Sequence, residues 1–209
     1  VWEGKRYTGD WKDDLMDGNG ELCWPSGDIY AGEWKEGKRH GKGLQIYATG
    51  DRYNGEWKDD RMDGRGEYVC RSGRKYKGEY KDDMKNGFGE ETWPDGSKYI
   101  GRWKDDLMHG AGTFTWPSGE MYVGEWAYGK RNGYGTNIWP NGVVHKGEWK
   151  DNKKHGRGET IAPDGKRYPG IWVNGIQQND GRLQATFLKQ PQLGWTDEQM
   201  AAKYGASIG

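Results

Sequence analysis

The sequence has few aliphatic side chains, few cysteines and no excess of either charge. Only 32% of its 209 residues are hydrophobic, and its mean hydropathy is −1.19. The 32 basic and 32 acidic residues cancel. The chain therefore lacks the basic excess typical of nucleic-acid-binding proteins, and we predict no nucleic-acid partner. No apolar run approaches the roughly 18–20 residues that a membrane-spanning helix needs.

Aromatic residues are abundant instead, and they recur at a fixed interval. The 13 Trp and 13 Tyr residues set this chain apart from disordered sequences, which are poor in aromatics. One slot repeats with a constant step of 23 residues and is filled by Tyr7, Tyr30, Tyr53, Tyr76, Tyr99, Tyr122, His145 and Tyr168. A fixed period of this length indicates a repeat architecture, in which each unit contacts mainly its neighbours.

The period also predicts how the chain is organised. A partial unit at residues 1–4 precedes eight units, which start near residues 5, 28, 51, 74, 97, 120, 143 and 166. Because the chain begins inside a unit, we expect it to be part of a longer array. The array covers residues 1–187. Its last unit is atypical, as capping units of solenoids often are, because Asn179 and Leu188 replace glycines.

Each unit is predicted to be a β-hairpin. In the first complete unit, residues 6–12 and residues 18–24 both alternate with period two, which is typical of strands. We expect a loop at residues 13–17 to connect the two strands. The turn at residues 25–27 ends in a glycine and returns the chain to the next unit.

Glycine pairs and charged slots recur within the predicted hairpins. Gly18 and Gly20 lie inside a strand, where glycine is unfavourable, so we interpret both as space for a ring from the neighbouring strand. Asp10, its mostly Glu equivalents and the lysines two residues later are predicted to form a solvated charged face. Acidic pairs in the loops, such as Asp59-Asp60, are interpreted as turn formers.

The two cysteines are not expected to form a disulfide. Cys23 and Cys70 occupy adjacent rather than equivalent positions of the repeat, so their side chains should point to opposite sides of a sheet. A reducing compartment, and hence a cytoplasmic location, is the natural prediction.

The C-terminal tail, residues 188–209, departs from the repeat. Thr196 and Gln199 have the spacing of a helical capping box, and Gly205 is a typical helix terminator. A short helix is therefore predicted at residues 197–204.

The repeated pattern Tyr-x-Gly-x-Trp, loop, Gly-x-Gly and glycine turn resembles the MORN repeat over residues 1–187. Tyr80 replaces the Trp in the fourth unit, and His145 replaces the Tyr in the seventh. The resemblance implies an all-β fold, an elongated single-layer antiparallel sheet of stacked β-hairpins (a MORN solenoid). Together with the tail prediction, this gives an all-β array followed by a short C-terminal helix.

The sequence gives no sign of an active site. Gly41-Lys42-Gly43 lacks the spacing of a phosphate-binding loop, and no helix is predicted to follow it. His40, His109 and His155 share one loop slot, but two or three units separate them, too far apart for one metal ion. We therefore predict no catalytic residue, no metal site and no cofactor.

Two surfaces are candidates for binding. The first is an aromatic groove for protein partners, lined by Trp24, Tyr47, Trp93, Trp116 and Trp139. The second is a set of basic loops that would meet anionic lipid, formed by Lys38, Arg39, Lys130, Arg131, Lys153 and Lys154. The alternative for the aromatic slot is that neighbouring rings cover one another completely.

For function, the resemblance favours a non-enzymatic scaffold or adaptor. Family members of this kind occur in cytoskeletal and ciliary assemblies, and some repeat-only members form dimers. The predicted partners are thus proteins, with self-association as a further expectation, and the predicted location is the cytoplasm, in association with cytoskeleton or membrane. Two alternatives stay open: a phosphoinositide-binding membrane tether, and a regulatory array belonging to a larger enzyme.

Overall fold

The computed structural model describes residues 4–178, and the elements in that range are strands, with no helix among them. In particular, no helix long and apolar enough to cross a membrane occurs in these residues. The helix predicted at residues 197–204 lies outside the described residues.

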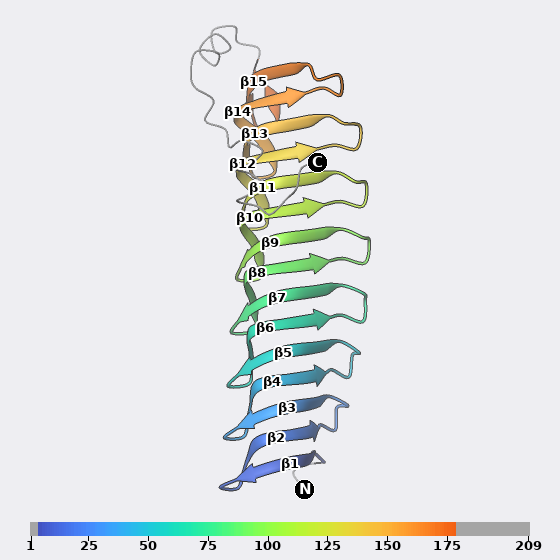
Figure 1. The fold of residues 1–209 in the computed structure, drawn as a ribbon, viewed down its shortest axis with the longest axis vertical. Coiled ribbons are helices and arrows are strands. Elements are labelled where there is room, and N and C mark those ends of the chain that lie inside the picture. The colour runs from blue at the N-terminus through green and yellow to red at the C-terminus, as the bar shows by residue number, and fades with distance from the viewer. Residues whose placement is uncertain (1–3, 179–209) are drawn as a thin grey trace. The chain divides into compact units, whose positions relative to one another are not determined.

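Sixteen strands follow the predicted repeat (Figure 1). The first eight are β1 (Arg6–Lys12), β2 (Leu15–Cys23), β3 (Ile29–Lys35), β4 (Lys38–Ile46), β5 (Arg52–Lys58), β6 (Arg61–Val69), β7 (Lys75–Lys81) and β8 (Met84–Thr92). The others are β9 (Lys98–Lys104), β10 (Leu107–Thr115), β11 (Met121–Ala127), β12 (Lys130–Ile138), β13 (Val144–Lys150), β14 (Lys153–Ile161), β15 (Arg167–Val173) and β16 (Ile176–Gln177).

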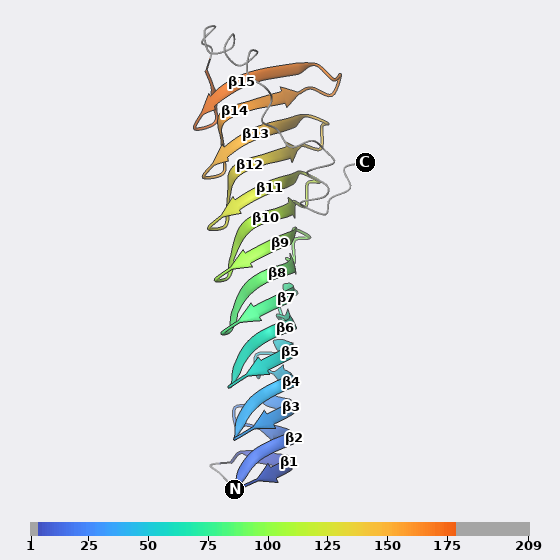
Figure 2. The ribbon, with the colours of Figure 1, turned by 60° about the vertical axis from the view of Figure 1, so that its left-hand side comes forward.

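All sixteen strands belong to one open antiparallel sheet, in which each strand pairs with the strands before and after it in sequence. The predicted all-β hairpin architecture is thereby confirmed. The chain divides into two compact units. Of the described residues, the first unit comprises residues 4–94 and Trp103–Asp106, and the second comprises Asp95–Arg102 and residues 107–178. Within each unit, successive hairpins lie side by side (Figures 1 and 2).

The hairpin turns are shorter than the predicted five-residue loops. Strand β1 ends at Lys12 and β2 begins at Leu15, so Asp13 and Asp14 alone form the connection. Both residues have positive φ, 49° and 62°, as a type I′ turn requires. The acidic pairs are turn formers, as predicted, but residues 15–17 belong to the second strand. A two-residue type I′ turn is favoured because its twist matches that of the flanking strands.

A bulge follows in every complete hairpin whose register is described. In β1 and β2, Gly9 pairs with Gly20 and Trp11 pairs with Met16, so three residues of β2 lie opposite Asp10 alone. Gly18, at the centre of these three, has a φ of 101°. Only glycine adopts this backbone conformation without strain. The first glycine of each pair is therefore needed for the bulge and not, as predicted, for ring packing.

The carboxylate opposite the bulge is part of this structure. Asp10 Oδ2 accepts a hydrogen bond from the backbone N–H of Asn19 at 2.9 Å, and Glu33 Oε1 accepts one from Lys42 at 2.9 Å. These side chains satisfy backbone donors that the irregular ladder leaves unpaired. Asp10 and Glu33 are exposed, as predicted for a solvated face, and in addition they support the bulge.

The second glycine of each pair does provide space for a ring, as predicted. A Cβ atom at Gly43 would overlap the phenol ring of Tyr30. Tyr30 is completely buried, and its hydroxyl donates to the Glu33 carbonyl at 3.0 Å. The ring replaces the missing side chain, which explains how a chain with few aliphatic residues excludes water from its core.

The core is a ladder of alternating Tyr and Trp rings on one face of the sheet. In the first unit, the Tyr30 ring makes edge-to-face contacts with Trp34 and Trp57, with centroids 5.0 and 5.4 Å apart. In the second unit, Tyr122 contacts Trp126 and Trp149 in the same way, at 5.2 and 5.5 Å. Each ring thus links its own hairpin to the next one, and such pairs contribute about 0.5–1.5 kcal/mol beyond their burial.

Candidate partner-binding face

Five aromatic residues are predicted to bind partners. Each is the first residue after a strand of the sheet. Trp24, Tyr47 and Trp93 follow β2, β4 and β8 in the first unit and are called the first aromatic row here. Trp116 and Trp139 follow β10 and β12 in the second unit and form the second aromatic row. All five are half-buried, whereas the neighbouring Tyr–Trp ladder is buried. These rings are therefore neither completely covered by one another nor fully exposed.

The aromatic rows contact cationic side chains from the ladder face. In the first unit, the Arg74 guanidinium carbon lies 5.8 Å from the centroid of the Trp93 ring. In the second unit, Arg131 lies 5.5 Å from Trp116, and the Lys154 ammonium lies 5.0 Å from Trp139. A cation at these distances is attracted to the electron-rich face of the ring.

The six basic residues predicted to lie in lipid-binding loops are strand residues. They occupy the first two positions of β4 (Lys38 and Arg39), β12 (Lys130 and Arg131) and β14 (Lys153 and Lys154). The prediction of loops was wrong because the two-residue turn lengthens each second strand at its start. The first residue of each pair is exposed and the second is half-buried.

Arg39 shows where the half-buried cations point. Its guanidinium lies 4.2 Å from the centroid of the Trp57 ring and donates to Gln45 Oε1 at 2.9 Å. It also donates to Asp60 Oδ1 at 3.1 Å and to the Asp60 carbonyl at 2.8 Å. The side chain is 21% exposed. Arg39 is thus a packing residue of the aromatic face, and only Lys38 of this pair is free to meet an external surface.

The aromatic face also carries a pattern that sequence analysis missed. Two of its positions, six residues apart, are filled by Met16/Leu22, Arg39/Gln45, Met62/Tyr68, Lys85/Glu91, Met108/Phe114, Arg131/Asn137 and Lys154/Thr160. Apolar and polar pairs alternate over the first six hairpins. The first position pairs with the ladder Trp and the second with the ladder Tyr, as Arg39 does with Trp34 and Gln45 with Tyr30. The alternation is visible in the sequence once this register is known.

Glu91 is the most deeply buried carboxylate of this pattern. It is 1% exposed, and its Oε2 accepts a hydrogen bond from Lys85 Nζ at 2.8 Å. Arg74 donates to its other carboxylate oxygen. Burial lowers the pKa of Lys85, although the bond to Glu91 opposes this effect. Lys85 also lies 4.2 Å from the centroid of the Trp103 ring. The buried charge is thus matched by two cations.

His145 takes the place of a ladder tyrosine. It is completely buried between Trp149 and Trp172, with ring centroids 5.6 and 4.7 Å away. Its Nδ1 lies 3.0 Å from Thr160 Oγ1, whereas Nε2 has no hydrogen-bond partner. Burial, assisted by the nearby charge of Lys154, lowers the pKa of His145 to about 3. The imidazole is therefore neutral at physiological pH.

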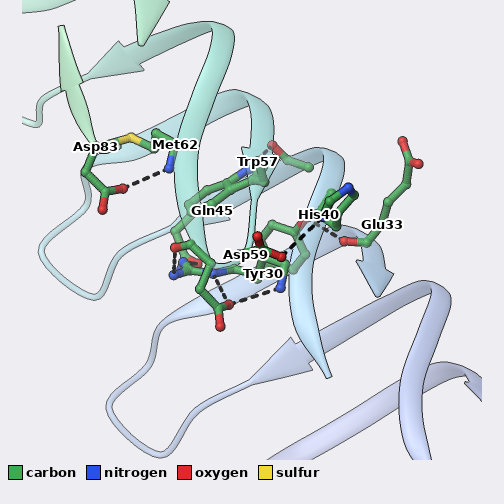
Figure 3. Close-up of polar contacts among 11 residues, drawn as sticks. Tyr30, Glu33, His40, Gln45, Trp57, Asp59, Met62 and Asp83 are labelled. Carbon is green, nitrogen blue, oxygen red and sulfur yellow. Dashed lines mark hydrogen bonds and ion pairs between the residues drawn. The ribbon is translucent and has the colours of Figure 1, made fainter. Parts of the chain in front are cut away.

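The other histidine slot lies in strands, not in loops as predicted. His40, His109 and His155 belong to β4, β10 and β14 and approach the turn of the following hairpin. His40 Nδ1, for example, lies 3.9 Å from Asp59 Oδ1 (Figure 3). Within residues 4–178, no group of three or more His, Cys, Asp or Glu side chains is placed to hold a metal ion.

The glycine bulge and the aromatic ladder recur in successive hairpins, and the sequence matches the MORN repeat at residues 7–29, 30–52, 53–73, 76–98, 99–121, 122–144 and 145–167. The chain belongs to the MORN-repeat family. Apart from Arg6 and Lys75, the seven matched MORN repeats contain the strands from β1 to β14, together with the first aromatic row and the second. The eighth predicted unit, which contains β15 and β16, follows the last matched repeat.

Some solved structures are similar to this MORN-repeat chain. One is the TCP domain of SAS-4 (dCPAP) from Drosophila melanogaster, in complex with a proline-rich motif of Ana2 (dSTIL). It is 12% identical with a TM-score of 0.48, over 81% of this chain and 91% of that one. Another is the TCP10 domain of CPAP from Danio rerio, in complex with a peptide of STIL. It is 15% identical with a TM-score of 0.21, over 85% and 100%. Scores this low add nothing to the family assignment. No curated protein matches the chain.

Proposed function

We propose that this MORN-repeat protein is a non-catalytic scaffold or adaptor that binds protein partners through the first and second aromatic rows. The observation that carries the proposal is the contrast in burial on one face. The ladder rings Tyr30 and Tyr122 are 0% exposed, whereas every ring of the two rows is partly open to solvent. Partly exposed aromatic rings beside a rigid core are typical anchors for a partner.

The proposed setting is a cytoskeletal or ciliary assembly in the cytoplasm. It rests on the resemblance to family members of the repeat-only type. A scaffold role fits a chain in which seven MORN repeats occupy most of the length.

The second aromatic row provides the most direct test. In affinity purification with the whole chain as bait, Trp116→Ala combined with Trp139→Ala is expected to lose partners that the wild type retains. Tyr128→Ala is the matched control, because Tyr128 is 75% exposed at a hairpin turn outside the row. The far-ultraviolet circular dichroism of all three proteins should coincide. Unfolding of the double variant would show that the rings serve packing, and unchanged partner retention would contradict the proposal.

Membrane tethering is a second candidate, favoured by the exposure of Lys38, Lys130 and Lys153. Flotation with phosphoinositide-containing vesicles, but not with neutral vesicles, would support it. Substituting these three lysines by Glu should then abolish flotation, because each cation near an anionic surface contributes about 1 kcal/mol. Substituting the half-buried Arg39 should have a smaller effect on flotation, since its guanidinium is already paired with Asp60.

A further inference from the structure

The cations that face the aromatic ladder are neutralised to different degrees. Four hairpins place a cation at the same slot, at Arg39, Lys85, Arg131 and Lys154. In each hairpin, two positions can hold an acceptor for the cation. One lies six residues later in the same strand, and the other lies twenty-one residues later in the next turn. For Arg39 these acceptors are Gln45 and Asp60. The acceptors of the four cations can therefore be compared position by position.

In the first unit at least one of the two positions holds a carboxylate in each hairpin. Arg39 pairs with Asp60 at 3.1 Å, and Lys85 pairs with Glu91 at 2.8 Å. The turn residue that follows Lys85, Asp106, accepts the Lys85 backbone N–H at 2.8 Å. Lys85 shares Glu91 with Arg74, and the charge of Asp106 acts on both cations, so the cations of the first unit have carboxylates beside them.

In the second unit neutral residues occupy the same positions. Arg131 donates to Asn137 Oδ1 at 2.8 Å and to the Asn152 carbonyl at 3.1 Å. Its nearest carboxylate is that of Glu120, 3.8 Å away, which already accepts a hydrogen bond from Asn137 at 2.9 Å. Arg131 Nε is buried without a hydrogen-bond partner. The guanidinium therefore carries charge that its surroundings compensate poorly.

Lys154 has still less compensation. Thr160 and Gly175 take the places of the two acceptors, and Lys154 forms no ion pair with any residue of 4–178. Its ammonium lies 5.0 Å from the centroid of the Trp139 ring and 5.9 Å from that of Trp172. Burial lowers the pKa of Lys154, and no carboxylate opposes the effect. A half-buried ammonium without a counter-charge is costly unless a ligand supplies one.

We propose that the second aromatic row, with Arg131 and Lys154, binds a segment of a protein partner in which a carboxylate side chain stands next to an apolar one. The carboxylate would pair with Lys154, and Arg131, one hairpin away, would add attraction at longer range. The apolar side chain would pack on the half-buried faces of Trp116 and Trp139. The corresponding cations of the first unit, Arg39, Arg74 and Lys85, are paired with carboxylates, so the two rows differ in specificity. This inference rests on the proposed partner-binding function and names the chemistry of the partner.

Selection of short random peptides on the whole chain tests the inference. We expect the enriched peptides to carry Asp or Glu beside Leu, Phe or Trp. Lys154→Gln should weaken their binding at least tenfold, because a hydrogen bond between charged groups contributes about 1.5–3 kcal/mol. Lys153→Gln is the matched control, since it removes the same charge from the exposed neighbouring residue. Lys154→Met, the residue type found at this slot in Met62, keeps the ring contacts and should bind as weakly as Lys154→Gln.

The possible failures are distinguishable. Enriched peptides that need Trp116 and Trp139 but bind Lys154→Gln as tightly as wild type would overturn the inference and leave the proposed function intact. Enrichment of neutral or basic peptides would do the same. No enrichment at all, or binding that survives Trp116→Ala with Trp139→Ala, would count against both. If no peptide is enriched but the protein floats with phosphatidylserine vesicles, and Lys154→Met abolishes the flotation, the ligand of this site is a membrane and not a peptide. Melting curves of each variant exclude loss of fold as the cause.

Discussion

The phenol ring of Tyr30 lies where a Cβ atom of residue 43 would stand, so that only glycine fits opposite it. The same relationship holds in the second unit between Tyr122 and Gly135. The tyrosine ring and the glycine that it covers thus form one packing unit, which is repeated along the sheet. This relationship makes the glycine a core residue, although it has no side chain to bury.

Gly43→Ala should therefore destabilise the protein by about 1–3 kcal/mol through overpacking. The measurement is chemical denaturation of the variant, of Tyr30→Ala and of the double variant. In the absence of the ring, Gly43→Ala should cost far less, which a double-mutant cycle would reveal as a favourable coupling. Additive effects would mean that the backbone, and not the Tyr30 ring, requires glycine here.

His145 makes the stability dependent on pH. Its folded pKa of about 3 lies below its ordinary value of 6.5. Between these values the unfolded chain binds a proton that the folded protein does not. Stability should accordingly fall as the pH drops below about 6.5, by at most about 1.4 kcal/mol per pH unit from this residue. His145→Tyr restores the ladder residue and should remove this slope from denaturation curves measured between pH 6.5 and pH 4. An identical slope in the wild type and in His145→Tyr would contradict the prediction.

The alternation of polar and apolar pairs predicts that a second substitution can restore the stability lost through a first one. Lys85→Met leaves the 1%-exposed Glu91 carboxylate with Arg74 as its remaining cation and should cost roughly 3 kcal/mol. Adding Glu91→Leu gives the combination found at Met16 and Leu22 and should restore most of the stability. Thermal denaturation of the single and double variants measures this. A double variant as unstable as the single one would show that the charge cluster is not exchangeable with the apolar pair.

One repeat lacks the carboxylate that supports the bulge, because Arg102 occupies the slot of Glu33. Arg102→Glu should place an acceptor beside the backbone N–H of Ala111, as Glu33 does for Lys42. We expect the free energy of unfolding to rise by about 1 kcal/mol, the typical net contribution of a hydrogen bond. Arg102→Ala serves as the control, since it removes the cation without adding an acceptor. Equal stabilities of the two variants would refute the role assigned to the carboxylate.

The sequence alone determined the period, the hairpin in each unit, and the need for glycine beneath each tyrosine. These features depend on the local alternation of residue types and on residue size, and both can be read from a repeated sequence. The acidic pairs also revealed the position of each turn, because Asp tolerates positive φ. The candidate rings of the two aromatic rows followed from the same alternation.

Only the tertiary structure decided which face the residues after each turn occupy. The bulge at Gly18 and its equivalents adds two residues to every second strand, so side chains before and after it keep the same face. The residues expected in loops therefore join the strand and its alternation. Arg39, Arg131 and Lys154 therefore point to the aromatic face and not away from it. Whether a carboxylate lies beside each cation depends on contacts between consecutive hairpins, which the alternation within one hairpin does not specify.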